Sequence, residues 1–175
     1  MKLLTGFRLL LLGCWLGAAI FFVVVAQNVF AAMPTHEAAG NLISRIFAIL
    51  NYSGLGIAFI VVLTSLIVPA GINRMALWIE RLLLIVFGLA CAVAQFVISW
   101  WMLLIRTQMG RPIDEVPADD PLRIQFDNLH QYSSWILITA AATAFIAFVI
   151  ISTRSTAPPK KPGFDNLDFQ KQFKV

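Results

Sequence analysis

The sequence predicts an all-α membrane protein, a polytopic bundle of four transmembrane helices. Hydrophobic residues make up 59% of the 175 residues and charged residues only 13%, and the mean hydropathy is +0.82. Soluble domains carry about 25% charged residues, so this composition excludes soluble enzymes, disordered chains and disulfide scaffolds. A membrane helix needs about 20 residues, and four stretches without Asp, Glu, Lys or Arg are long enough: 9–26, 46–73, 82–105 and 131–153.

The first helix is expected over residues 7–33, because Pro34 lacks the backbone N–H that a continuing helix needs. Its apolar run exceeds the about 7–15 residues of a signal peptide, so we expect an uncleaved membrane helix. Cys14 lies in this run and Cys91 in the third. Both are expected to be buried, packed thiols, since the chain has no CxxC pair for zinc or redox chemistry.

The second helix is expected over residues 38–70, with Thr35 as a cap and Glu37 near its N-terminus. Residues 38–50 place apolar side chains on one face, which predicts an amphipathic segment at the membrane interface before the span. One straight helix from His36 to Ala70 would be about 50 Å long, more than the bilayer needs. A bend is easiest at residues 53–56, whose sequence is Ser-Gly-Leu-Gly.

The third and fourth helices are expected over residues 75–105 and 121–152. Residues 106–120 form a long connection rich in proline and acidic side chains. Asp120 before Pro121 is a typical helix start, because Asp caps the first turn and proline fits the first helical position. The fourth helix is expected to have an extended amphipathic start. Residues 1–154 are expected to form a single domain, followed by a cytoplasmic tail, residues 155–175.

Lysine and arginine indicate the orientation, because they are retained on the cytoplasmic side of a membrane. Nine of the 13 lie on the side of the two termini: Lys2, Arg8, Arg74, Arg81, Arg154, Lys160, Lys161, Lys171 and Lys174. The other side carries Arg45, Arg106, Arg111 and Arg123. We therefore expect a multi-pass protein of the inner (plasma) membrane with both termini inside and the acidic connection outside.

Small residues are expected to mark helix contacts, because lipid gives helices no hydrophobic reason to associate. Gly13 and Gly17 form a GxxxG pattern on the first helix, and Gly88 and Ala92 have the same spacing on the third. Packing within the bundle is the main interpretation. Self-association through the first helix is the alternative.

Polar side chains are predicted to gather in the outer half of the bundle. Every membrane helix contributes some of them: Gln27, Asn28, Asn51, Gln95, Ser133 and Ser134. The inner half offers little beyond Thr64 and Ser65, and we expect no carboxylate deep in the membrane. Unpaired polar groups are costly in hydrocarbon, so one cluster is expected near Arg45 and the acidic connection. It is either a hydrogen-bonded clamp or a pocket for a small ligand, ion or cofactor.

One face of the fourth helix carries Arg123, Asp127, His130 and Ser134 at intervals of four, three and four residues. Asp127 is expected to fix the tautomer of His130. These groups resemble a hydrolytic triad in composition only, because a serine within a helix has no free N–H groups beside it for an oxyanion hole. No enzyme activity is expected.

Metal and cofactor binding remain open as minor alternatives. His130 and His36 are weak metal candidates, and with Met33 and Met109 they could hold copper(I) at the outer surface. One axial imidazole on a haem or chlorin is the other possibility. No cofactor is the main expectation, because the sequence has no closely spaced pair of ligands.

Residues 122–133, with the sequence LRIQFDNLHQYS, resemble the Phe-Asp-x-Leu-His-x-x-Ser signature of the transmembrane protein 205-like family, which includes bacterial domains of unknown function. Weaker matches are residues 15–17 and 40–47, and the resemblance covers roughly residues 5–153. It implies a four-helix membrane protein without an established enzymatic activity. The residues that match the signature, as a motif of unassigned role, are Phe126, Asp127, Leu129, His130 and Ser133.

These features favour a membrane protein without a catalytic site, most simply a structural or accessory subunit of a larger membrane complex. Its expected partners are the lipid bilayer and other membrane subunits or a second copy, not nucleic acid. The first alternative is a transporter or resistance protein for a small solute or metal ion. The second is a haem- or chlorin-binding membrane protein with a histidine ligand.

Overall fold

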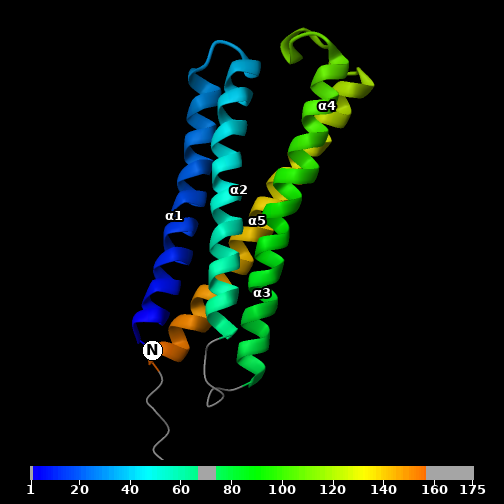
Figure 1. Ribbon diagram of the computed structural model, residues 1–175. Helices are drawn as coiled ribbons and strands as arrows, with labels where there is room; N and C mark the ends of the chain where they lie inside the picture. The colour runs from blue at the N-terminus through cyan, green and yellow to red at the C-terminus, as the bar shows by residue number, and fades with distance from the viewer. Residues whose placement is uncertain (1, 67–73, 157–175) are drawn as a thin grey trace, which may run out of the picture.

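The computed structural model describes residues 2–66 and 74–156 of the chain, and all regular structure in these residues is helical. The elements are α1 (Lys2–Ala32), α2 (His36–Leu66), α3 (Arg74–Ala92), the π-helix η1 (Val93–Ile98), α4 (Ser99–Met109), the short 3-10 helix η2 (Ile113–Glu115) and α5 (Pro121–Thr156). Because α3, η1 and α4 follow one another without a break, the described residues contain four spans long and apolar enough to cross a membrane (Figure 1). The predicted four-helix membrane bundle is confirmed.

The helix ends have local causes in the sequence. Thr35 Oγ1 accepts a hydrogen bond from the backbone N–H of Ala38 at 3.2 Å, which caps α2. Asp120 Oδ1 accepts from the backbone N–H of Leu122 at 2.8 Å and caps α5, as its position before a proline predicts. Gly110 ends α4 with φ 63°, a left-handed conformation that glycine adopts without strain. Residues 67–70 of the expected second helix and residues 157–175 of the expected tail lie outside the described residues.

The expected bend in the second helix is absent, and the distortion lies in the third span. α2 runs unbroken through residues 53–56. The third span contains the π-helical turn η1, in which the carbonyl of Ala94 accepts from both the backbone N–H and the Oγ of Ser99, the latter at 2.9 Å. A π-turn widens a helix and changes the direction of the next turns. Beyond η1, α4 leans away from α1 and α2 (Figure 1).

The four spans form a ring in which α1 and α3 each pack between α2 and α5. α1 and α3 therefore stand diagonally opposite, and they meet at the axis, where the rings of Trp15 and Phe87 pack edge to face with centroids 4.6 Å apart. α5 contributes a buried row of small residues, Ala140, Ala144 and Ala147. The start of α1 and the end of α5 lie together at one end of the bundle, here called the terminal end, and η2 marks the opposite, η2 end (Figure 1).

The predicted small residues differ in how closely they bring helices together. A Cβ on Gly88 would lie 3.2 Å from the Cβ of Ala58, so α3 approaches α2 closely there. Gly13 faces Phe148 at 3.6 Å, whereas a Cβ on Gly17 would meet nothing within 4 Å. Of the two glycines in the GxxxG pattern of α1, only Gly13 therefore lies against another helix of the described bundle. Ala92 is half-buried.

The closest approach occurs at Gly54 of α2, which is not among the predicted contact residues, although Gly54 and Ala58 have the same spacing as Gly88 and Ala92. A Cβ there would lie 2.7 Å from Cys91 Sγ and 2.8 Å from Trp15 Nε1. The indole N–H of Trp15 also donates to the carbonyl of Leu50 at 3.0 Å. Cys91 is buried, as expected, but Cys14 is exposed on the outside of the bundle, because apolar character does not distinguish a core-facing position from a lipid-facing one.

Candidate functional site

At the η2 end, polar contacts fasten the connection between α4 and α5 onto the first turn of α2. Asp114 of η2 accepts from the backbone N–H of Glu37 at 3.3 Å, and its other oxygen lies 3.2 Å from His36 Nδ1. A carboxylate is favourable at a helix N-terminus, where the backbone N–H groups lack partners. Within the connection, Arg111 Nη2 and Asp120 Oδ2 lie 3.7 Å apart and form an ion pair.

Arg106 joins three helices at this end. Its Nη1 donates to Asn41 Oδ1 of α2 at 2.6 Å, and its guanidinium lies over the ring of Phe126 of α5, 5.1 Å from the centroid. Gly40 makes the approach possible, because a Cβ there would lie 2.8 Å from Arg106 Nη2. The guanidinium of α4 thus braces α2 and α5 together.

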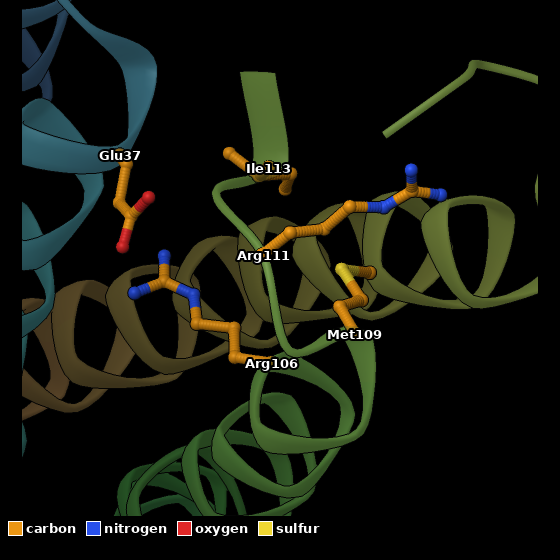
Figure 2. Close-up of a pocket in the computed structure, with 5 residues that line it drawn as sticks. All are labelled: Glu37, Arg106, Met109, Arg111 and Ile113. Carbon is orange, nitrogen blue, oxygen red and sulfur yellow. The ribbon is translucent and has the colours of Figure 1, made fainter. Parts of the chain in front are cut away.

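A small pocket opens beside this brace. It is lined by Glu37, Arg106, Met109, Arg111 and Ile113. In Figure 2 the carboxylate of Glu37 turns towards the guanidinium of Arg106, whereas the guanidinium of Arg111 points away from both. The cavity volume is about 40 Å³, which has room for water or one small ion. The charged groups of its lining are one carboxylate, that of Glu37, and two guanidiniums, those of Arg106 and Arg111.

The predicted motif of α5 divides between two faces of the helix. Phe126 and Leu129 are buried in a cluster with residues of η1, α4 and η2, so this half of the motif holds α5 in place. Asp127, His130 and Ser134 are exposed, and Ser133 is half-buried. The motif therefore acts as a packing surface on one side and a polar surface on the other.

The expected contact between Asp127 and His130 does not form. Asp127 Oδ2 accepts from Arg123 Nε at 3.3 Å instead, because a guanidinium attracts a carboxylate more strongly than a neutral imidazole does. Arg123 also donates from Nη1 to the carbonyl of Ile113, which ties α5 to η2. Ser134 Oγ donates to the backbone carbonyl of His130 at 3.2 Å. The four residues therefore make two separate local contacts, Arg123 with Asp127 and Ser134 with the carbonyl of His130, and lack the geometry of a triad.

The other predicted polar residues do not gather in one cluster. Gln27, Asn28 and Arg45 are exposed, and Asn28 Nδ2 donates to a carbonyl of its own helix, that of Val24, at 2.8 Å. Asn51 is buried in α2, and Gln95 lies within η1. His36 and His130 are both exposed. No group of three or more His, Cys, Asp or Glu side chains that could hold a metal ion occurs in the described ranges 2–66 and 74–156.

The terminal half contains a buried ion pair that the hydropathy pattern concealed. Arg8 of α1 donates to Glu80 of α3, and the two residues are 3% and 0% exposed. The neighbouring Arg81 donates to Ser65 of α2, from Nε to Oγ at 3.2 Å and from Nη2 to the carbonyl at 2.9 Å. The expectation that this half offers little polarity beyond Thr64 and Ser65 is therefore wrong, because it also holds two buried charges.

A signal for this pair exists in the sequence. Arg8 and Glu80 each lie at the edge of an uncharged stretch, one helical turn or less from its first residue. An ionisable group at such a position either reaches water or pairs with an opposite charge inside the bundle. A search for opposite charges at the same membrane depth would have found the two residues.

Four apolar spans around a common core, with charges paired inside the bundle, define a multi-pass membrane protein. A family model described as a domain of unknown function (DUF4149) matches residues 10–111, more than half of the chain. The chain belongs to this family. The matched residues extend from α1 to the end of α4 and stop before the motif of α5. The comparisons with curated proteins and with solved structures give no match.

Proposed function

We propose that this protein is a structural subunit of a larger membrane complex and carries no catalytic site. The observation that carries the proposal is the filled axis of the bundle. Trp15 packs against Phe87 and Arg8 pairs with Glu80 across the diagonal, and all four side chains are buried. The described helices of a single copy therefore form a packed unit whose axis is filled by side chains, and the polar groups at its η2 end are largely engaged with one another.

The outward faces of the spans support a partner that is also embedded in the membrane. Trp78 and Trp100 on the third span are exposed and lie about 33 Å apart along the helix at 1.5 Å per residue. Tryptophan favours the two membrane interfaces, which are about 30 Å apart. The exposed apolar side chains between them would contact lipid, other membrane subunits or a second copy. In this proposal the membrane is the inner (plasma) membrane.

The proposal includes a relationship between this chain and the transmembrane protein 205-like family. The motif in α5, which resembles the signature of that family, supports this relationship. The burial of Phe126 and Leu129 supports a structural role for the motif that needs no ligand. No haem, chlorin or copper is part of this proposal. A visible absorption band in the purified protein would contradict that part of it.

The test is purification from native membranes in mild detergent through an affinity tag placed after Val175, followed by mass spectrometry and a mass measurement of the intact particle. We expect a fixed set of membrane subunits in constant ratio to this chain. An unrelated four-span protein with the same tag serves as the control for membrane proteins that bind unspecifically. A lone monomer or a homo-oligomer would contradict the subunit role.

Transport of a small solute or metal ion is the second candidate, and the pocket between Glu37 and Arg106 is the observation that favours it. Because the axis of one copy is filled, such transport would need a path between copies. Glu37→Gln removes the charge that faces Arg106, and Glu115→Gln, in the exposed turn η2, is the matched control. Loss of resistance or accumulation in the first variant alone, at normal expression, would support transport, and unchanged flux in both would contradict it.

A further inference from the structure

Two polar atoms in the middle of the bundle have no hydrogen-bond partner among the residues that the structure describes. One is the amide nitrogen Nδ2 of Asn51, a residue only 2% exposed, and the other is the amide oxygen Oε1 of Gln95. Asn51 is the middle residue of α2, and Gln95 belongs to the π-helical turn η1. Both atoms are enclosed at membrane depth, where neither bulk water nor lipid can satisfy them.

The packing of α2 against the third span places these two residues at the same level of the contact between the helices. The two helices run antiparallel, and Gly54 meets Cys91 at their contact, where a Cβ would lie 2.7 Å from Sγ. Asn51 is one turn before Gly54 on the same buried face, and Gln95 is one turn after Cys91. The next residues along the two helices are Tyr52 and Phe96, and the centroids of their rings lie 6.1 Å apart. This neighbouring contact fixes the register.

A donor without an acceptor and an acceptor without a donor thus lie at one level of this helix contact, and no direct hydrogen bond joins them. A bridging water resolves this arrangement, because it accepts one hydrogen bond and donates another. The bridging molecule must be uncharged, since the N–H group of Asn51 would repel a cation and the oxygen of Gln95 would repel an anion. It must also be small, because both atoms are enclosed.

The π-helical turn provides a local reason for space at this level. It inserts an extra residue into the turn and shifts the backbone hydrogen bonds, so that Ser99 reaches back five residues to the carbonyl of Ala94. A regular α-helix would place Gln95 and its neighbours in a tighter turn. The polar pair and the widened turn therefore coincide at one level of the bundle.

We propose that Asn51 and Gln95 form a binding site for one water molecule at the middle of the membrane-spanning bundle. The water accepts from Asn51 Nδ2, donates to Gln95 Oε1, and links α2 to the third span at the π-turn. The site is independent of the proposed subunit role, because a monomer would contain it as well.

The test uses the full chain in lipid nanodiscs with isotope-labelled asparagine and glutamine side chains. Nuclear magnetic resonance then measures magnetisation transfer between water and each side-chain amide. We expect a signal from long-lived water at the Asn51 amide, and its loss in Gln95→Leu. Gln27→Leu, an exposed position near the η2 end, is the matched control and should leave the Asn51 signal intact. An Asn51 amide without a water signal, or with one that persists in Gln95→Leu, would overturn the proposal.

Unfolding in detergent gives a second measurement. Asn51→Leu and Gln95→Leu should each lower the unfolding midpoint, and the double variant should lose less than the sum of the two, because no orphaned partner remains. Additive losses, or no loss in either single variant, would overturn the proposal. Coupling between the residues without a water signal would show a direct amide–amide bond and would also overturn it.

Discussion

Arg8 and Glu80 show how this chain keeps two charges inside an apolar bundle. Each neutralises the other across the diagonal between α1 and α3, where water does not reach. Such a pair contributes little net stability compared with apolar side chains of the same size, but loss of one partner leaves a buried charge. The pair therefore acts mainly as a constraint on how α1 and α3 meet.

The first prediction concerns this pair. Glu80→Ala should lower the free energy of unfolding in detergent by about 3–5 kcal/mol, because Arg8 then remains buried without a counter-charge. The double variant Arg8→Met with Glu80→Leu should recover most of this loss. Glu115→Ala, at an exposed position, is the control and should have almost no effect. A Glu80→Ala protein as stable as the control would show that the ion pair is not buried as described.

The second prediction compares two glycines two residues apart on α2. Gly54→Ala should destabilise the protein by about 1–3 kcal/mol, because the new Cβ would collide with Cys91 Sγ and Trp15 Nε1. Gly56→Ala meets open space and should be neutral or stabilising by up to about 1 kcal/mol, since alanine favours a helix more than glycine does. Thermal unfolding in detergent measures both. Equal effects would contradict the close contact of three helices at Gly54.

Among the helices and turns, η2 depends most on single side chains. It is only three residues long, and it is held to α2 through Asp114 and to α5 through Arg123. Its buried apolar contacts come from Ile113 and the neighbouring Val116, so the polar bonds supply much of the remaining order at this end.

The third prediction therefore concerns Asp114. Asp114→Ala should speed hydrogen–deuterium exchange in residues 36–40 and 111–118, because α2 loses the carboxylate that accepts from its first turn. The membrane spans should exchange at their original rate. Glu115→Ala, the next residue in the same turn, is the matched control. Unchanged exchange at the start of α2 would mean that the cap contributes nothing to the order of this end.

The caps of α2 and α5 were predictable because Thr35 and Asp120 act on the next turn of the same chain. The π-turn η1 was not, because nothing in the sequence of residues 93–98 breaks a helix. Its position depends on how the third span fits against α2 and α5. The continuity of α2 was not predictable either. Gly54, which suggested a bend, instead allows close packing against Cys91 and Trp15.

For the molecule as a whole, the fourth prediction concerns orientation. A reporter that works only outside the cytoplasm should be inactive when fused after Val175 and active when inserted after Ala118, because most lysines and arginines lie on the side of the termini. The structure is consistent with such a result in one respect: the start of α1 and the end of α5 lie at the same end (Figure 1). Activity of the fusion after Val175 would reverse the proposed topology.

The number of spans, the apolar class and the approximate helix ends could be derived from composition, run length and local capping residues. These features depend on neighbours in the chain and on transfer of side chains from water, which each segment experiences separately. The polar row of α5 could also be recognised from its spacing, and the rest of the motif follows only from the family resemblance. The division of that motif into a buried face with Phe126 and an exposed face with His130 could not, since it depends on where α4 and η2 lie.

Only the tertiary structure decided which polar groups meet. It paired Arg8 with Glu80, enclosed polar atoms of Asn51 and Gln95 without a partner, and left Asn28 and Cys14 on the outer surface. The physical reason is that the outside of a membrane bundle is as apolar as its core, so hydropathy does not say which face of a helix points inward. Packing of small residues and pairing of a few polar groups make that choice, and both require all four helices at once.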